Sequence, residues 1–250
     1  MHIVVQEVLK SMWKKSCDDV VLSKSHTVHL WLADLPRLKN KISCYEQLLS
    51  VEEWRRATKF IQKSDQEKFI LSKSVTRIIL SRYLNCAPEK VNFKLGEHEK
   101  PYILGGLLQF NISHSGDYFL LGVTLTNPIG VDIEFEKNNL DFLSLAKRFF
   151  STSEYDAIST VLADEQKSAF YRCWTRKEAF VKATGLGLSF GLSDFEVAVS
   201  ESVQSQLLHV SCAQFSADDF VLRSVFVARK NYHAAFAVHG VVDEVFCFEF

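Results

Sequence analysis

Three consecutive strand-like segments between residues 110 and 135 constrain the fold of this chain most strongly. The segments 110–113, 119–126 and 129–135 are separated by turn signals at Gly116-Asp117 and Asn127-Pro128. An earlier strand is expected over 27–34, where Val28, Leu30 and Leu32 alternate with His29 and Trp31 and give the strand one apolar face. Four closing strands are expected over 195–199, 221–228, 234–239 and 241–248.

Helices are expected between these strands. Ser50-Val-Glu-Glu53 has the capping-box pattern and predicts a helix through about Ile61, and Ser64-Asp-Gln-Glu67 predicts a second helix to about Leu84. Later helices are expected over 140–149, 153–162 and 164–184, and Gly185 suits the residue that follows the last of them. Each half of the chain combines strands and helices, and we expect the boundary between the halves near Pro128.

The charge is distributed unevenly between the two parts of the chain. The formal net charge of the 250 residues is −1, but residues 1–100 carry 18 basic and 12 acidic side chains, and the rest carry 11 and 18. The basic excess is concentrated between residues 55 and 82. These basic residues could form a solvated helix face or a nucleic-acid-binding surface. The second interpretation is disfavoured, because the negative charge of residues 101–250 would repel a duplex and the sequence has no nucleic-acid-binding motif.

The remaining composition is that of a water-soluble globular protein. Hydrophobic residues make up 47% of the chain, and no uncharged apolar window is long enough for a membrane helix. The N-terminus lacks the pattern of a signal peptide, so we expect a cytoplasmic protein that does not act at a membrane. The six cysteines lie far apart, without a metal-binding spacing, and are expected to be free and mostly buried thiols.

Asp132 and Glu134 form the first candidate site. In Gly130-Val-Asp-Ile-Glu134 they lie two residues apart on a predicted strand, so both project from one face. Neighbouring carboxylates repel each other unless a cation lies between them, and oxygen ligands of this kind suit Mg²⁺. The spacing alone also fits the solvated edge of a strand.

Trp174, Glu178 and Lys182 form the second candidate site. They are successive i, i+4 neighbours on one face of the predicted helix 164–184. A surface ion pair between Glu178 and Lys182 beside a core tryptophan would explain the spacing equally well. The Gly185-Leu-Gly-Leu188 sequence that ends the helix indicates a close backbone approach.

The third candidate site is the strand and turn Phe110-Asn-Ile-Ser-His-Ser-Gly116. Hydroxyls, backbone N–H groups and an imidazolium can together hold a phosphate, although a polar hairpin turn would show the same residues. Ser113 and His114 point to opposite faces of a strand, which disfavours a nucleophile–base pair. Lys100, before Pro101 in a loop, is nonspecific when taken alone.

In this order the segments resemble the Sfp-type 4′-phosphopantetheinyl transferases, most strongly over residues 98–199. The matching segments are Lys100-Pro101, Phe110-Asn-Ile-Ser-His-Ser-Gly116, Gly130-Val-Asp-Ile-Glu134, Ala146-Lys-Arg-Phe-Phe150-Ser, Trp174-Thr-Arg-Lys-Glu-Ala-Phe-Val-Lys182 and Gly185-Leu-Gly-Leu188. The resemblance implies an α+β fold of two similar α/β halves, here 1–128 and 129–250, related by a pseudo-twofold axis with the site in the cleft between them.

The resemblance also implies the reaction and its partners. Members of this family move the 4′-phosphopantetheine arm of coenzyme A, their substrate, onto a serine of an acyl or peptidyl carrier protein and release adenosine 3′,5′-bisphosphate. Such chemistry depends on Mg²⁺, and positioning and charge neutralisation dominate it. We expect a monomer, because the two halves already supply the cleft.

Carried over position by position, the resemblance assigns roles to individual residues. Asp132, Glu134 and Glu178 are the expected Mg²⁺ ligands, and Trp174 orients the helix of Glu178. Glu178 is the first candidate for the general base and His114 the second. The expected coenzyme contacts are Lys100, Pro101, Ser113, His114 and Lys182, with Arg55, Arg56 and Lys68 as candidates for its 3′-phosphate.

Two other kinds of function use the same residues. A metal-dependent phosphohydrolase would use the carboxylates with water as nucleophile in place of a carrier serine. A noncatalytic binder of coenzyme A or of carrier domains would not need three carboxylates together with Lys182. Release of the nucleotide product with and without a carrier distinguishes these functions.

Overall fold

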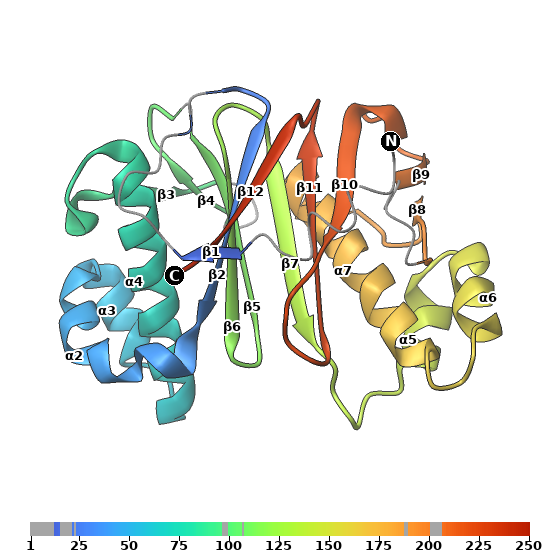
Figure 1. The fold of residues 1–250 in the computed structure, drawn as a ribbon, viewed down its shortest axis with the longest axis horizontal. Coiled ribbons are helices and arrows are strands. Elements are labelled where there is room, and N and C mark those ends of the chain that lie inside the picture. Colours follow the sequence, from blue (N-terminus) through green and yellow to red (C-terminus); the bar gives the residue numbers. More distant parts are fainter. Residues whose placement is uncertain are drawn as a thin grey trace.

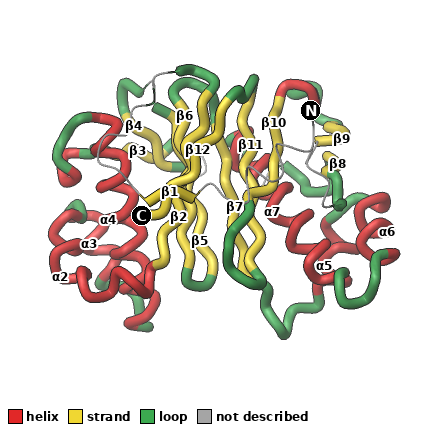
Figure 2. Tube along the Cα trace, in the orientation of Figure 1, coloured by secondary structure: helices red, strands yellow, loops and turns green. Residues whose placement is uncertain are grey.

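The computed structural model describes residues 13–15, 22, 24–96, 100–106, 108–187, 190–200 and 207–250. Strands occupy the middle of the molecule and helices lie on both flanks (Figures 1 and 2). The chain therefore has the expected mixed α+β class. Leu188 and Glu99 of the predicted motifs, and Cys17, lie outside the described residues.

The larger sheet has five strands in the order β1-β12-β2-β6-β5. Strand β6 pairs antiparallel with β2 on one side and with β5 on the other. Strand β12, from the other end of the sequence, pairs parallel with β2. The bounds are Trp13–Lys15 for β1, Glu244–Glu249 for β12, Thr27–Asp34 for β2, Tyr118–Thr124 for β6 and Gln109–Ser115 for β5. The C-terminal strand thus completes a sheet that is otherwise built from the first half of the chain.

Strand β2 coincides with the predicted strand 27–34, but the prediction of a single apolar face is wrong. Residues 27–33 are all buried because β2 lies between β12 and β6, with a layer of side chains on each face. Val28, Leu30 and Leu32 pack toward the smaller sheet, and Trp31 packs on the helix side. His29 on that side bonds the Tyr83 hydroxyl, with 2.8 Å between Nδ1 and the oxygen.

Helices of the first half cover the outer face of the larger sheet (Figure 1). Helix α3 spans Val51–Ala57 and begins with the predicted capping box, in which Ser50 and Glu53 satisfy each other's backbone N–H groups. Helix α4 spans Lys63–Leu84 and ends near the predicted residue, with Asn85 in the left-handed conformation. The capping box predicted at Ser64 is wrong, because Ser64 already lies within α4 and Gln62 precedes the helix without a side-chain cap.

The smaller sheet has three antiparallel strands in the order β10-β11-β7. Their bounds are Phe220–Val225, Tyr232–His239 and Ile129–Phe135. Helix α7, Gln166–Thr184, packs on β7 and β11, and Gly185 follows it with a positive φ of 75° as expected. Helices α5 (Phe142–Phe149) and α6 (Thr152–Thr160) flank α7, and β8 (Phe195–Val197) pairs with β9 (Leu207–Val210).

Short elements complete the described chain. They are α2 (Ile42–Tyr45), β3 (Phe93–Leu95), β4 (Pro101–Ile103) and 3₁₀ turns at Leu35–Lys41, Glu46–Leu48, Pro88–Lys90 and Ala217–Asp219. No helix in the described part of the chain is long and apolar enough to cross a membrane. The five described cysteines are free thiols, but only Cys173 and Cys247 are buried, so the expectation of mostly buried thiols is wrong.

The two sheets meet along β5, β6 and β7. Between them lies an apolar cluster to which β2 contributes Leu30, β6 contributes Leu120 and β7 contributes Val131 and Ile133. The division into halves at residue 128 and their relation by a pseudo-twofold axis stay predictions. The junction brings together β5 and β7, which carry the predicted phosphate-binding and carboxylate residues.

Candidate functional site

A row of polar side chains on β5 bridges to β7 in place of backbone pairing. The Asn111 amide oxygen accepts a bond from the Val131 N–H at 2.9 Å. The Ser113 hydroxyl donates to Asp132 Oδ1 at 2.8 Å, and the Ser115 hydroxyl donates to Glu134 Oε2 at 2.6 Å. Because side chains alternate along a strand, residues two apart on β5 face the two carboxylates, also two apart, on β7.

Lys182 of α7 reaches the same place from the other side. Its Nζ lies 2.6 Å from Asp132 Oδ1, 3.2 Å from the Ser113 hydroxyl and 3.2 Å from the carbonyl oxygen of Val131. Asp132 is only 3% exposed, and its second oxygen, Oδ2, is buried with no hydrogen-bond partner among the residues that the structure describes. Lys182 thus forms its ion pair with Asp132, in contrast to the surface pair with Glu178 that the spacing alone allowed.

The negative charge of Asp132 affects the pKa values of Glu134 and Glu178. Burial raises the pKa of Glu134 and outweighs the Ser115 hydroxyl, which lowers it, and the charge of Asp132 raises it further. The pKa of Glu178 is raised by burial and then by Asp132, while Lys182 opposes the rise. Mutual repulsion of this kind marks a place where a cation would be stabilised.

The carboxylates do not form a closed metal cage as they stand. In the described part of the chain, no group of three or more His, Cys, Asp or Glu side chains is arranged to hold a metal ion. Two observations nevertheless fit Mg²⁺: the unpartnered Asp132 Oδ2 is a free oxygen donor, and all three nearby acids are oxygen ligands. A site that keeps waters and takes phosphate oxygens does not need a complete protein cage.

Gly130 allows α7 to lie close to β7. A Cβ at this position would lie 2.0 Å from the carbonyl oxygen of Ala179 and 2.4 Å from the amide nitrogen of Ala183. Both are backbone atoms of α7, so neither can move away unless the helix itself shifts. The absence of a side chain at Gly130 therefore brings Lys182 within reach of Asp132.

Two buried cations anchor α7 on the side away from the larger sheet. The Lys177 ammonium pairs with Glu154 at 2.8 Å and donates to the carbonyls of Leu192 and Phe195. Arg176 donates to Ser224 and to the carbonyls of Ala198 and Ser200. Trp174 packs among the aromatic residues of this core, and its role in orienting the helix of Glu178 stays a prediction.

Lys100 is held at the junction by backbone carbonyls. Its Nζ donates to the Lys182 carbonyl oxygen at 2.6 Å and to the Ile129 carbonyl oxygen at 3.2 Å. Burial and the positive charge of Lys182 lower the pKa of Lys100 to about 8. The ammonium thus links the loop before β4 to the start of β7 and the end of α7.

His114 lies on the opposite face of β5 from Ser113, and it is only partly shielded from solvent. Its pKa is lowered by burial of the ring and then by the positive charges of Lys182, Lys68 and Lys73. Lys68 itself donates to the carbonyl oxygen of Gly116 at 2.7 Å. His114 therefore lies in a cationic field that extends from Lys182 to α4.

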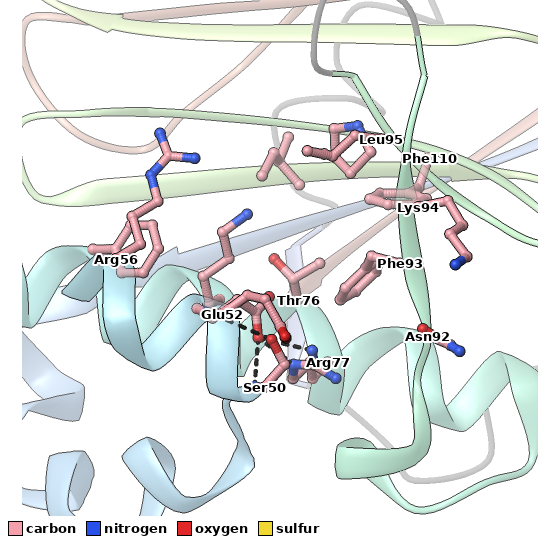
Figure 3. A pocket seen from close by; sticks show the side chains of 15 residues that line it. Ser50, Glu52, Arg56, Thr76, Arg77, Asn92, Phe93, Lys94, Leu95 and Phe110 are labelled. Atoms are coloured by element: carbon pink, nitrogen blue, oxygen red, sulfur yellow. Dashed lines mark hydrogen bonds and ion pairs between the residues drawn. The ribbon is translucent and has the colours of Figure 1, made fainter.

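A pocket of about 580 Å³ lies between helices α3 and α4 and strands β3 to β5 (Figure 3). Arg56 lines it and lies over the Phe69 ring, with 5.6 Å from the guanidinium carbon to the ring centre. Pro101 lines it from β4, while Arg55 and Lys68 are not among its lining residues. Arg55 and Arg56 were both predicted to bind the 3′-phosphate, but of the two only Arg56 lines this pocket.

Two residues of the site, Asn111 and Ser115, were missed in the sequence analysis. Both belong to the motif 110–116, in which only Ser113 and His114 were expected to be site residues. The signal was available as polar residues at positions 111, 113 and 115, which share one face of a strand. The facing carboxylates at 132 and 134 have the same spacing of two.

Comparison with known proteins places the chain in a family. A profile of the 4′-phosphopantetheinyl transferase superfamily matches residues 128–237, and a profile of the N-terminal part of 4′-phosphopantetheinyl transferases matches residues 36–125. The chain belongs to the 4′-phosphopantetheinyl transferase family and is a transferase.

Individual relatives cover most of the chain. It is 34% identical to the 4′-phosphopantetheinyl transferase HetI of Nostoc sp., over 85% of this chain and 92% of that protein. It is 33% identical to the transferase Sfp of Bacillus subtilis, over 68% and 75% of the two chains. A crystal structure of the Thermotoga maritima holo-[acyl-carrier-protein] synthase aligns over 46% of this chain and 63% of that chain, with a TM-score of 0.34 and 21% identity.

Proposed function

We propose that this protein transfers the 4′-phosphopantetheine arm of coenzyme A to a serine of an acyl or peptidyl carrier protein. The products are the holo-carrier and adenosine 3′,5′-bisphosphate. The observation that carries the proposal is the contact of Lys182 with Asp132 and Ser113, which joins all three sequence motifs at one point. Family membership supports the substrate class.

In this reaction the carrier serine oxygen forms a bond to the β-phosphorus of the coenzyme's pyrophosphate. The bond from that phosphorus to the bridging oxygen breaks, and adenosine 3′,5′-bisphosphate leaves with the electron pair. The serine proton passes to a base. Charge on the phosphate oxygens must be neutralised during the transfer, and this is the task of the cationic and metal-binding residues.

Asp132, Glu134 and Glu178 would hold a Mg²⁺ ion. When bound, such an ion offsets the negative charge of the pyrophosphate and stabilises the leaving group. The unpartnered oxygen of Asp132 and the mutual effect of the three carboxylates on their pKa values support this assignment. Ser113 and Ser115 hold Asp132 and Glu134 in place by hydrogen bonds, so the carboxylates keep one orientation.

Lys182 is proposed as the fixed cation for the pyrophosphate, with Ser113 and His114 as neighbouring donors. The Lys182 side chain is 28% exposed, so it can contact both Asp132 and a ligand. Lys100 supports the end of α7 through the Lys182 carbonyl, and Pro101 contributes to the pocket wall. Arg55, Arg56 and Lys68 are the candidates from the sequence for the 3′-phosphate.

Two residues are proposed as alternatives for the general base. Glu178 is the first, because its helix presents it beside Lys182 and the other carboxylates. His114 is the second, because the lowered pKa of its ring leaves a neutral imidazole that can accept a proton. Retained activity in His114→Ala would exclude His114 as the base, and retained activity in Glu178→Gln would exclude Glu178.

The distinguishing experiment measures release of adenosine 3′,5′-bisphosphate from coenzyme A and Mg²⁺ with and without an apo-carrier domain. The proposal expects release only with the carrier, in proportion to holo-carrier formed. Release that does not depend on the carrier would support a phosphohydrolase, and no release with binding retained would support a noncatalytic binder. A carrier with its acceptor serine replaced by alanine is the control.

We further propose that the protein acts as a cytoplasmic monomer and does not require nucleic acid or a membrane. All proposed site residues come from one chain, which supports activity as a monomer. Elution of the active protein at the volume of a 28.6 kDa species would agree with this proposal.

A further inference from the structure

The row of acids that begins with Asp132 and Glu134 extends one position beyond β7. Glu136 follows the strand directly, two residues after Glu134, and its carboxylate reaches α7. Because side chains alternate along an extended chain, the acids at 132, 134 and 136 lie on the face of β7 that α7 covers (Figure 1). On the neighbouring strand β11, His233 lies directly opposite Glu134, and cross-strand partners project from the same face. Glu136 and His233 thus share the face of the predicted metal ligands.

Two basic side chains hold the Glu136 carboxylate. The His233 Nε2 lies 2.8 Å from Oε1, and the Lys167 Nζ lies 3.7 Å from Oε2. Because an ionised carboxylate only accepts hydrogen bonds, the His233 Nε2 is the donor. The contact is shielded from water, since the Glu136 side chain is 14% exposed and that of His233 is 16% exposed. Lys167 also donates to the side-chain oxygen of Asn138 at 3.3 Å, so α7 holds the chain beyond β7 at two points.

Tyr171 of α7 fixes the backbone of the same segment. Its hydroxyl accepts a hydrogen bond from the Lys137 N–H at 2.9 Å, and its ring lies nearly parallel to the His233 imidazole, at an angle of 13° and with 6.0 Å between the ring centres. Burial raises the pKa of Tyr171, the Lys137 N–H lowers it, and the charges of Glu134 and Glu136 raise it further, so Tyr171 lies near both acids. We call four residues the anchoring cluster: Glu136, Lys167, Tyr171 and His233.

The three acids of the row differ in how their charges are neutralised. Lys182 pairs with Asp132 at one end of the row, and Lys167 pairs with Glu136 at the other. Glu134, between them, forms no ion pair within the described ranges. The row therefore leaves the charge of its middle member available to a bound cation, and the anchoring cluster holds the end of the row next to it.

We propose that the anchoring cluster positions Glu134 beside Glu178 for a divalent cation, so that its four members are positioning residues of the transfer site. This inference rests on the proposed function, since the cation belongs to that reaction. The hydroxyl contact of Glu134 fixes only one of its oxygens, Oε2. The direction of the side chain also depends on the backbone that follows, which the cluster ties to α7, the helix that carries Glu178. Outer contacts of this kind commonly set the affinity of a metal site.

The test measures metal binding and does not depend on transfer. Titration with Mn²⁺ alone, followed by the electron paramagnetic resonance of the free ion, gives the affinity of the protein for a cation with the oxygen preference of Mg²⁺. Tyr171→Phe removes the hydroxyl that fixes the Lys137 N–H and changes no charge. We expect it to weaken Mn²⁺ binding about 10-fold, the lower end of the effect of outer contacts on metal affinity. His233→Phe keeps an aromatic ring beside Tyr171, loses the bond to Glu136 and should also weaken Mn²⁺ binding.

The variants separate positioning from a general electrostatic effect. His233→Phe leaves the negative charge of Glu136 with one partner fewer, so a purely electrostatic effect would strengthen Mn²⁺ binding, whereas positioning predicts the opposite. The matched controls are His239→Phe, further along β11, and Tyr155→Phe, on α6. Both lie outside the anchoring cluster and should leave the affinity for Mn²⁺ unchanged. Control variants that weaken Mn²⁺ binding as much as Tyr171→Phe does would overturn the proposal.

Carrier loading at different Mg²⁺ concentrations separates positioning from damage to the fold. Tyr171→Phe should need about 10-fold more Mg²⁺ for half-maximal loading, while saturating Mg²⁺ restores the rate and the KM for coenzyme A measured there stays near the wild-type value.

The outcomes distinguish this inference from the proposed function. Unchanged Mn²⁺ affinity in either Tyr171→Phe or His233→Phe would overturn the inference even if the wild type loads carriers normally, and so would a wild type that binds no Mn²⁺. Failure of the wild type to load any carrier would refute the proposed function, while weaker Mn²⁺ binding by both variants would still support the anchoring cluster.

Discussion

Replacement of Lys177 by methionine tests how α7 is anchored. Lys177 has no exposed side-chain surface, and its partner Glu154 has 2%. The ammonium lies 2.8 Å from Glu154 Oε1, 2.7 Å from the carbonyl oxygen of Leu192 and 2.6 Å from that of Phe195. Methionine has a similar length and fills the same space, so the variant removes the charge and leaves little cavity.

The expected loss is large because water cannot compensate. Glu154 remains as a buried charge, and the N–H groups of Ser151 and Val197 still donate to it. Breaking a buried ion pair from one side typically costs about 3–5 kcal/mol. Since a domain is usually stable by only about 5–15 kcal/mol, Lys177→Met should consume a large part of the total free energy of unfolding.

Urea unfolding followed by circular dichroism measures this loss. The second variant, Lys177→Met with Glu154→Gln, removes the stranded charge while glutamine can still accept a bond at the start of α6. We expect it to recover about 1–2 kcal/mol relative to Lys177→Met alone. The control is Lys167→Met, which removes a partly exposed lysine from the same helix.

Two results would refute the reasoning about this pair. A loss below about 1 kcal/mol for Lys177→Met would show that the ammonium is not a buried electrostatic anchor. If the double variant is less stable than Lys177→Met alone, the unpaired Glu154 carboxylate is not what destabilises the single variant.

The other predictions concern the site and its support. Asp132→Ala and Glu178→Ala should abolish carrier loading while circular dichroism shows an intact fold; loading at near wild-type rate by either variant would show that the proposed metal site is wrong. Gly130→Ala should cost about 1–3 kcal/mol in urea unfolding and reduce loading, because the new Cβ meets the backbone of α7; unchanged stability would contradict this. Burial lowers the pKa of Lys100 to about 8, below its unfolded value of about 10.4, so its charge destabilises the folded state below pH 8 and this penalty fades as pH rises to about 10. The stability of wild type relative to Lys100→Met should therefore increase over that range, and a pH-independent difference would contradict the argument.

Local patterns predicted the fold well where the chain determines structure over a few residues. The period-two alternation located β2 at its observed bounds, and Gly185 marked the end of α7 because a left-handed residue there suits glycine. The capping box at Ser64 failed although it matched the same pattern as Ser50. Helix α4 already begins before it, so the pattern lies inside the first turn.

Long-range contacts could not be predicted from local patterns. Nothing in the sequence of β12 indicates that it pairs with β2, more than 200 residues earlier. The two faces of β2 are buried by helix α4 on one side and by the smaller sheet on the other, and local patterns do not show either contact. Lys177 and Arg176 were given no role from the sequence. They are buried where carbonyl groups of the segment 192–200 accept their hydrogen bonds.

The candidate site was predicted in part for the same reason. The residue types at 113, 132, 178 and 182 indicated phosphate and metal chemistry, and three of them meet in the structure through the Lys182 ammonium. The partner of Lys182 was not predictable, since its spacing suited Glu178 while the close approach at Gly130 brings it to Asp132.

The most direct test of the central claim is the mass of an apo-carrier domain after incubation with this protein, coenzyme A and Mg²⁺. The account predicts that the carrier gains one phosphopantetheine group on its acceptor serine and that Lys182→Met fails to add it. An unchanged carrier mass across fatty-acid, polyketide and peptide carrier domains would contradict the claim, as would full loading by Lys182→Met.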